Sequence, residues 1–310
     1  MTSLTPIERC AAVSRATGIE VLVKRDDLGH PSHGGSKWRK LDGILADARA
    51  ASATDLVTLG SAASNHVVAT SVHAGALGVH AVLTPHPDTP QARAALRAMI
   101  ALGSELHPAR GDRQVVTTVA RLMSRLRLAG RRPYFIAPGG SSALGAAAYL
   151  AAVREIHGQL DDWPDLIGCA LASGGMQAGL AAGLASCAAR CHLVGVKVRD
   201  GWATRERFVR WLGGRALRRV GDKPRRLQID IVDATGPGYG RASEAGDRAG
   251  RLFAEDGILL DSTYTAKAAA ALLEVARARR ARRVLFWHSY APPPPARVAI
   301  PERLARLLGA

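Results

Sequence analysis

The sequence predicts an α/β protein of two domains, each an open, twisted and mostly parallel sheet covered by helices. Short apolar runs alternate with amphipathic segments along the whole chain, which is typical of parallel sheets with helices on both faces. The length of 310 residues suits one large or two moderate domains. A hydrophobic content of 47% is ample for the cores of such domains.

The N-terminal half contains the first predicted elements. A strand is expected at 19–23, and a glycine-containing loop then leads into a helix with apolar positions from Leu41 onward. Further strands are expected at 55–59, 80–83 and 134–136. Helices are expected from near Ser64, over 89–102 and over 112–129, where apolar residues recur at helical spacing.

The C-terminal half continues the same alternation. Four more strands are expected at 166–171, 193–198, 227–232 and 284–287, with helices between them. A stiff, extended run of four prolines at 292–295 precedes a short terminal helix.

The loops that directly follow the predicted strands are candidates for a ligand site. In open parallel sheets, ligands bind at the carboxyl ends of the strands. Most of these loops are rich in glycine, and all carry short polar side chains. They are residues 60–66, 137–142, 172–179 and 288–290.

Composition argues against several classes of protein. The formal net charge of +16 invites a nucleic-acid interpretation, but aromatic residues make up only 5% and do not interleave with the basic runs, so we expect no nucleic-acid partner. No apolar stretch approaches the length of a membrane span, and we expect a cytoplasmic protein. The cysteines lack the spacing of a metal or disulfide framework. We therefore expect core cysteines and no metal, although Cys187, Cys191 and His192 lie close together.

Lys37 is the most informative single residue. Only six of the 42 basic residues are lysines, so a generic surface cation in this chain is an arginine. Lys37 follows a glycine pair at the start of a predicted helix, where the helix dipole disfavours an ammonium and favours a neutral amine. A neutral lysine amine can form an imine with an aldehyde such as pyridoxal phosphate (PLP). An ordinary exposed lysine is the alternative interpretation.

The loop at 173–179 predicts a small phosphate-binding cup. It follows a strand and opens a helix, where glycines let backbone amides turn toward a dianion. It matches neither the P-loop nor the dinucleotide fingerprint. A tight strand-to-helix turn is the alternative. Ser64 or Asn65 could cap the helix that starts there, or that helix start could bind a substrate carboxylate.

The chain resembles the D-cysteine desulfhydrase / 1-aminocyclopropane-1-carboxylate (ACC) deaminase family, which has the tryptophan synthase β-like fold (PLP fold type II). The resemblance runs over nearly the whole chain and rests on motifs in a fixed order, namely Thr5-Pro6-Ile7-Glu8-Arg9, Val23-Lys24-Arg25-Asp26-Asp27-Leu28, Gly34-Gly35-Ser36-Lys37-x-Arg39-Lys40-Leu41, Ser64-Asn65-His66, Gly139-Gly140-Ser141-Ser142-x-Leu144-Gly145, Ser173-Gly174-Gly175-x-Gln177-Ala178-Gly179, Gly236-Pro237-Gly238-Tyr239-Gly240 and Leu260-Asp261-x-x-Tyr264-Thr265-x-Lys267. We expect residues 1–50 and 151–310 to form a larger PLP-binding domain and residues 51–150 a smaller α/β domain.

The resemblance implies a role for each site residue. Lys37 would hold PLP as an imine and shuttle the Cα proton, and Asn65 would bind the ring hydroxyl. The phosphate cup would be lined by Ser173, Gly174, Gly175 and Met176. Ser64 and His66 would face the substrate, with Ser64 near its carboxylate, while Tyr239 and Tyr264 would lie over the reacting carbon and relay protons. Ser289 would approach the pyridine nitrogen.

The implied activity is that of a PLP-dependent lyase or deaminase of a small amino acid, working as a homodimer. A hydroxyl such as Ser289 beside the ring nitrogen leaves a weaker electron sink than a carboxylate would. That suffices for β-elimination of a good leaving group such as thiolate, but gives little help in opening a cyclopropane. His66 and Thr265 also match the D-cysteine desulfhydrase branch, since ACC deaminases carry Gln and Glu there. An α,β-elimination giving keto acid, ammonia and sulfide is therefore expected.

Several departures from the family pattern keep alternatives open. Ser36 replaces the usual Asn before the lysine, Met176 removes a hydroxyl donor from the cup, and Ala266 replaces a glycine. The usual His-Thr-Gly-Gly becomes His288-Ser289-Tyr290-Ala291 before the prolines. ACC deamination, another amino-acid lyase reaction, or a non-catalytic PLP- or amino-acid-binding protein are the alternatives.

Overall fold

The computed structural model describes residues 4–309, and they form two compact units. The larger unit combines the N-terminal segment up to Lys40 with Ser141–Tyr290. The smaller unit combines Leu41–Gly140 with the C-terminal segment from Ala291. The sequence analysis had placed residues 41–50 and 291–310 in the larger domain and residues 141–150 in the smaller one. The C-terminal segment groups with the smaller unit because Leu304 and Leu307 pack into that unit's core and because residues 86 and 308 form a β-bridge.

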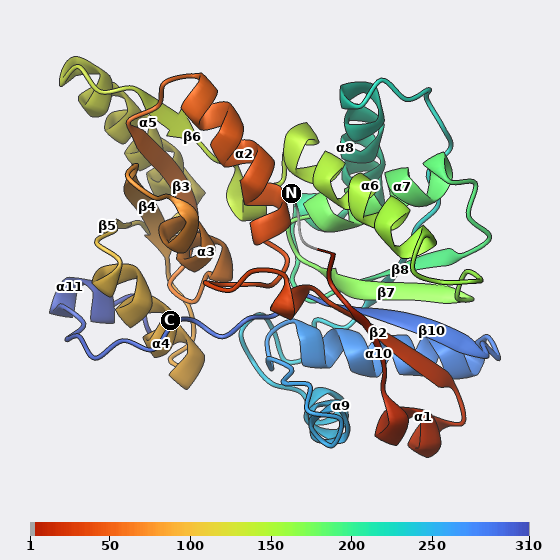
Figure 1. Cartoon of the computed structure of the whole chain (residues 1–310). Coiled ribbons are helices and arrows are strands. Elements are labelled where there is room, and N and C mark those ends of the chain that lie inside the picture. Colours follow the sequence, from red (N-terminus) through yellow and green to blue (C-terminus); the bar gives the residue numbers. More distant parts are fainter. Residues whose placement is uncertain (1–3, 310) are drawn as a thin grey trace. The chain divides into compact units, whose positions relative to one another are not determined.

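The larger unit is built on a six-stranded sheet in the order β1-β2-β10-β7-β8-β9 (Figure 1). All neighbours run parallel except the edge pair β1 and β2, which is antiparallel. The sequence analysis missed β1. The strands are β1 Ile7–Arg9, β2 Glu20–Arg25, β7 Leu166–Leu171, β8 His192–Lys197, β9 Asp230–Asp233 and β10 Arg283–His288.

Helices cover both faces of this sheet, as expected for a parallel sheet. One core contains side chains of α6 (Ala143–His157), α7 (Gly175–Ser186) and α8 (Glu206–Arg219). The other contains side chains of α1 (Ala11–Thr17), α9 (Glu244–Ala254) and α10 (Thr265–Ala278). Short 3₁₀ turns, η1 Asp26–Leu28 and η3 Trp202–Thr204, lie in the connections.

Close packing between α6 and α7 depends on glycine. A Cβ at Gly179 would lie 2.1 Å from the carbonyl oxygen of Ala146, and one at Gly183 would lie 2.5 Å from Cβ of Val153. These two positions therefore let the helix backbones approach each other. The apolar character of α7 all round follows from this burial, since ten of its residues, 175–184, are buried.

The smaller unit is built on a four-stranded parallel sheet in the order β5-β4-β3-β6. Its strands are β3 Asp55–Ser61, β4 Gly78–Thr84, β5 Glu105–Pro108 and β6 Pro133–Phe135. One face packs on α3 (Asn65–His73), α4 (Pro90–Ala101) and the segment around α11 (Glu302–Ala305). The other packs on α5 (Gly111–Leu128). The turn η2 (Pro138–Gly140) follows β6, and α2 (Trp38–Ala50) contains the boundary between the two units.

Most predicted elements are present with shifts of one to three residues. The strand expected at 227–232 is shortened to β9, and β5, like β1, was missed by the sequence analysis. Cys10 and Cys169 are buried as expected, whereas Cys187 and Cys191 lie half-buried at the edge of a core, and all four thiols are free. Across the described residues, no helix combines the length and apolar character needed to cross a bilayer.

Candidate active site

Lys37 lies in a tight turn immediately before α2, rather than inside the helix. The turn is shaped by two glycines. Gly35 has φ +81°, and a Cβ at Gly34 would lie 2.0 Å from the carbonyl oxygen of Asp27. The amide of Ser36 donates to the carbonyl of Ser289 (3.0 Å), so the lysine turn is tied to the end of β10. Sequence alone had predicted the glycine turn and the position of the lysine.

A fully buried carboxylate, Asp26, anchors this turn. It accepts hydrogen bonds from the side chains of Thr5 (3.0 Å), Arg39 (2.9 Å), Tyr149 (3.0 Å) and Trp287 (2.8 Å). Its backbone carbonyl also accepts from the amide of Gly35 and the indole of Trp38. The four side-chain donors come from different parts of the chain, so the carboxylate fixes the turn with respect to the sheet of the larger unit.

A second layer of charge surrounds Asp26. Glu155 on α6 binds the guanidinium of Arg39 (2.8 Å) and the ammonium of Lys24, and Lys24 also donates to the carbonyl of Thr5 (2.6 Å). Burial lowers the pKa of Lys24. For Glu155, burial is the largest single influence and acts to raise the pKa, but the paired cations Arg39 and Lys24 together outweigh it, so the pKa is lowered. Motif residues Thr5, Lys24, Asp26 and Arg39 are thus structural supports of the lysine turn.

The amine of Lys37 is held in a state that favours loss of its proton. Burial lowers the pKa of Lys37 to about 8, and the nearby Asp261 carboxylate opposes the shift. The cause is therefore removal from water rather than the helix dipole that the sequence had suggested. Nζ donates to the hydroxyl of Ser36 (2.6 Å), the residue that stands where the family pattern has Asn.

Lys40 is a second lysine that sequence reasoning left without a role. It is 1% exposed and lies three positions after Lys37, in the first turn of α2. Burial lowers its pKa well below the ordinary value, the Lys37 charge adds to the shift, and Cys169 on β7 opposes it. The signal was available in the sequence, because Lys40 is one of only six lysines and shares a motif with Lys37.

The loop after β7 has the backbone expected of an anion cup. Gly174 caps α7 with φ +76°, where a Cβ would lie 2.6 Å from the carbonyl oxygen of Ala203. A Cβ at Gly175 would lie 2.6 Å from the hydroxyl of Ser141. The first-turn amides of α7 have no acceptor within the helix, so they can face an anion. Met176 is buried beside them.

Two hydroxyls line the same loop. Ser141 donates to the hydroxyl of Ser173 (2.9 Å) and accepts from the amide of Gly175 (3.2 Å). Ser141 belongs to a motif that the sequence analysis quoted without giving it a role. It restores a hydroxyl near a cup in which Met176 had removed one.

Tyr239 and Tyr264 form a pair. Their hydroxyls are hydrogen-bonded to each other, and their rings meet edge to face with centroids 5.8 Å apart. Burial raises the pKa of Tyr264 well above its ordinary value, and the neighbouring Tyr239 adds to the shift, so the Tyr264 phenol stays protonated. The ammonium of Lys267 donates to the carbonyls of Thr235 (2.9 Å) and Gly238 (3.0 Å) and so fixes the glycine loop that carries Tyr239.

Asp261 organises the turn that carries Tyr264. Its carboxylate accepts from the amides of Thr263 (3.0 Å), Tyr264 (2.9 Å) and Thr265 (3.0 Å) and from the hydroxyl of Thr265 (2.7 Å). Thr265, the first residue of α10, is therefore buried and bound to Asp261 through both its amide and its hydroxyl. Asp261 also acts electrostatically on Lys37 and Tyr290, so it lies near both. The sequence analysis had quoted Asp261 but assigned it no function.

The end of β10 presents Ser289 and Tyr290. Ser289 is partly exposed, and Tyr290 is 8% exposed, with burial raising the pKa of its phenol to about 12. The preceding His288 is buried with a lowered pKa, again because of desolvation. Tyr290 is thus a buried phenol under the electrostatic influence of Asp261.

The smaller unit carries the remaining predicted residues. Ser64 is the N-cap of α3, and its hydroxyl accepts from the amide of Val67 (3.4 Å), so the capping interpretation holds. Asn65 is the first residue of the helix and is partly exposed. His66 is 3% exposed, and its Nε2 lies 2.9 Å from the hydroxyl of Thr58. This contact gives His66 a structural partner, and its predicted contact with substrate stays a prediction.

Within the larger unit, the predicted residues follow strands whose carboxyl ends share one edge of the sheet. Lys37 comes after β2, the Ser173 loop after β7, Tyr239 after β9 and Ser289 after β10. Chain topology thus gathers a dehydrated amine, an anion cup, a phenol pair and a hydroxyl at the edge where parallel sheets bind ligands.

Comparison with known proteins agrees with this arrangement. Residues 2–289 match the sequence profile of the family described as pyridoxal-phosphate dependent enzyme. A D-cysteine desulfhydrase of Klebsiella pneumoniae is 34% identical, covering 92% of this chain and 90% of the relative, and one of Salmonella paratyphi A is 36% identical, covering 87% and 85%. The crystal structure of an ACC deaminase homologue superimposes with a TM-score of 0.85 at 29% identity, covering 99% of this chain and 96% of that one.

The chain is a pyridoxal-phosphate-dependent enzyme. It belongs to the D-cysteine desulfhydrase / ACC deaminase family, and the predicted fold class is confirmed. The residues present fit the cofactor: the helix start at Gly174 and Gly175 offers its first-turn amides to a phosphate dianion, and Lys37 supplies an amine with a lowered pKa for the aldehyde.

Proposed function

We propose that this enzyme catalyses α,β-elimination from a small β-substituted amino acid, with D-cysteine as the preferred substrate and a keto acid, ammonia and sulfide as products. The observation that carries the proposal is the dehydrated Lys37 amine, with a pKa of about 8, held near Asp261. Tyr264 follows Asp261 by three residues and pairs with Tyr239. A proton acceptor and a phenol that can donate a proton are what an elimination needs.

Lys37 is the proposed base that takes the proton from the substrate's Cα. Bound PLP supplies the electron sink that stabilises negative charge at that carbon. A base with a pKa near neutrality combines a sizeable neutral fraction with useful proton affinity. The Asp26 network keeps the lysine turn rigid, which holds the base at a fixed distance from the carbon it acts on.

The phosphate group is assigned to the loop of Ser173, Gly174, Gly175 and Met176, with Ser141 beside it. Lys40 is proposed to bind the same phosphate, because Cys169, which influences its pKa, lies on the strand that leads into the loop. A bound dianion would raise the pKa of Lys40, which burial has lowered, and so favour its charged form.

Tyr264 and Tyr239 are the proposed proton carriers toward the leaving group. The phenol of Tyr264 stays protonated at neutral pH, so the pair can donate to a departing thiolate. Lys267 keeps the Tyr239 loop in place. Ser289 offers a hydroxyl, not a carboxylate, near a ring nitrogen, which suits elimination of a good leaving group better than opening of a cyclopropane.

Ser64 and Asn65 are proposed to bind the substrate carboxylate and the cofactor's ring hydroxyl, as the family resemblance implies. A cytoplasmic homodimer belongs to the same proposal and has the same support. ACC deamination is the second candidate, because the similar crystal structure is described as that of an ACC deaminase homologue.

The test is product analysis with purified protein. D-cysteine is expected to yield sulfide and pyruvate, while Lys37→Ala yields neither and Tyr264→Phe loses about 10²-fold in kcat. Lys223→Ala is the matched control, since Lys223 is exposed. Ammonia from ACC without sulfide from D-cysteine would favour the second candidate. A bound chromophore with no product from a panel of D- and L-amino acids would refute an enzymatic function.

A further inference from the structure

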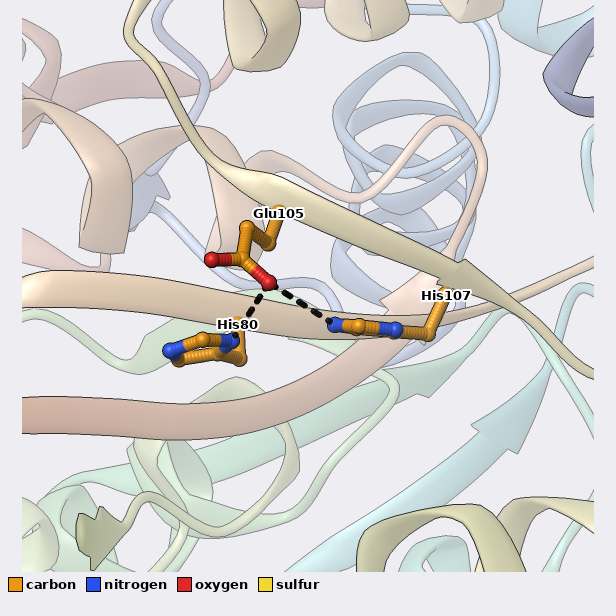
Figure 2. A group of neighbouring side chains, drawn as sticks. All are labelled: His80, Glu105 and His107. Carbon is orange, nitrogen blue, oxygen red and sulfur yellow. Dashed lines mark ion pairs between the residues drawn. The ribbon is translucent and has the colours of Figure 1, made fainter. Parts of the chain in front are cut away.

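The smaller unit contains a group of ligating side chains at the opposite end of its sheet from Ser64 and Asn65. These are His80 on β4 and Glu105 and His107 on β5, the edge strand. One ligand atom from each lies within 4.8 Å of the other two (Figure 2). Asp55, which is beside them, begins β3, whereas Ser64 follows the strand's other end, about 20 Å away along seven residues.

Strand register explains why these side chains meet. Residue 55 pairs with 78, residue 80 with 105, and residues two apart on a strand share a face. Asp55, His80, Glu105 and His107 therefore point to the face covered by α5. Gly78 makes room for them, because a Cβ there would lie 2.5 Å from Oδ1 of Asp55.

Each of the two imidazoles has one ring nitrogen without a hydrogen-bond partner among the described residues. Nδ1 of His80 and Nε2 of His107 are buried atoms that make no hydrogen bond within residues 4–309. They lie 3.3 Å and 4.0 Å from the same oxygen, Oε2 of Glu105. The rings are stacked with centroids 5.9 Å apart. The His80 side chain is 5% exposed, so its ring has no alternative partner in bulk water.

The other nitrogen of His80 is already committed. Nε2 lies 3.2 Å from Oδ1 of Asp55, and Asp55 is in turn bound by Arg131 through two hydrogen bonds (2.7 and 2.8 Å). A carboxylate acceptor places the proton on Nε2 and leaves a lone pair on Nδ1. This carboxylate–histidine pair is the outer shell found behind metal-bound histidines.

We propose that Nδ1 of His80, Nε2 of His107 and a carboxylate oxygen of Glu105 form a site for a divalent late first-row metal of the Zn²⁺ class. Two imidazoles and one carboxylate are a common set for such ions, with a fourth position left for water. Ligand atoms of a tetrahedral zinc lie about 3.4 Å apart. The observed 3.3 and 4.0 Å between Glu105 and the two histidine nitrogens are close to that spacing, and the Glu105 side chain is 61% exposed and so can turn toward an ion.

Nearby guanidinium groups set the strength of the site. Arg125 of α5 lies 3.7 Å from Glu105 and competes with a cation for the same carboxylate. Arg131 neutralises Asp55. The site therefore binds more weakly than an isolated set of these ligands would, and removal of Arg125 strengthens it. An increase in metal affinity when Arg125 is removed distinguishes a metal site from an ordinary ion-pair cluster.

The test titrates Co²⁺ and Zn²⁺ into the full-length holoenzyme. One equivalent is expected to bind, with the Co²⁺ visible spectrum lacking thiolate bands and with a higher melting temperature in Zn²⁺. Glu105→Gln and His107→Gln are expected to weaken binding about tenfold or more, and Asp55→Asn by about 10- to 100-fold. Arg125→Gln, on an exposed side chain, is expected to tighten it.

His192→Gln is the matched control, because His192 also lies on a strand near a carboxylate, Asp230, and next to Cys191. The metal affinity of the His192→Gln variant should equal that of the unaltered enzyme. Absence of saturable binding would overturn the proposal. So would affinity that falls in His192→Gln but persists in Glu105→Gln and His107→Gln. Turnover of amino acid in metal chelator should be unchanged, because the site is separate from the candidate active site.

Discussion

The two units each hold a buried aspartate among cations and ring donors, and only one of the two clusters leaves a ring nitrogen without a hydrogen bond among the described residues. Asp26 in the larger unit is 0% exposed and receives hydrogen bonds from four side chains, each from a different part of the chain. Asp55 in the smaller unit receives them from Arg131, Thr54 and His80, and His80 then presents an unused nitrogen toward an exposed glutamate.

The difference indicates how to separate support from function. A carboxylate whose donors all end within the protein fixes geometry and leaves nothing for a ligand, and in this enzyme it fixes the turn of Lys37. A carboxylate that orients a histidine with a spare lone pair passes its influence outward to a ligand. A buried charge alone therefore does not identify a binding site. A polar atom without a hydrogen bond, next to a fully hydrogen-bonded charge, does point to one.

The largest effect is expected from Asp26→Asn. It removes the charge that compensates Arg39 inside the protein, and breaking a buried pair costs about 3–5 kcal/mol of unfolding free energy. Urea denaturation of the variant and the unaltered enzyme would measure this. Asp88→Asn, whose ion pair to Arg93 is exposed to solvent, should cost much less. Equal losses in the two variants would contradict the special position of Asp26.

The next effect concerns the pH dependence of the Lys37 amine. Its pKa of about 8 means that the neutral, nucleophilic form increases about tenfold from pH 7 to pH 9 and then levels off. The rate at which enzyme stripped of cofactor takes up PLP should follow that curve. A rate that keeps climbing toward pH 10.5 would indicate an ordinary hydrated lysine. Asp26→Asn should shift the midpoint upward if the network keeps water away from the turn.

A smaller effect is expected from Asp55→Asn in metal-free buffer. Burial opposes ionisation, but Arg131, Thr54 and His80 together lower the pKa of Asp55 to about 2. The carboxylate is then a source of stability above the unfolded pKa of about 4, and that stability is lost as the pH falls toward 2. Because Arg131 is half-exposed, the cost at pH 7 should be about 1 kcal/mol. Denaturation at pH 7 and at pH 2.5 should give a difference between enzyme and variant that shrinks in acid.

Much of the fold and part of the site could be predicted from the sequence. Strand–helix alternation gave the parallel sheets, and glycine spacing marked the turn of Lys37 and the cup after β7. The edge strands β1 and β5 were missed because each is only three or four residues long and lacks a clear apolar run. The domain limits were misjudged because the C-terminal segment returns to the smaller unit, a long-range contact without a local signal.

The roles of single residues depended most on tertiary contacts. Thr265 matched a family marker, yet its hydroxyl is used to cap a turn with Asp261. His80 and His107 are 27 residues apart, and no spacing rule connects them, since their meeting follows from strand register. Lys40 had a signal in its rarity, but only its burial distinguishes it from a surface lysine.

By itself, the sequence determined which local structures form and which chemical groups are available, because helix periodicity, strand apolarity and glycine conformations act over a few residues. The tertiary structure alone decided which charges are removed from water and which donors are left over. Desolvation and pairing depend on neighbours brought together from distant parts of the chain, and these two quantities underlie the proposed base at Lys37, the support at Asp26 and the proposed metal site at the histidines of β4 and β5.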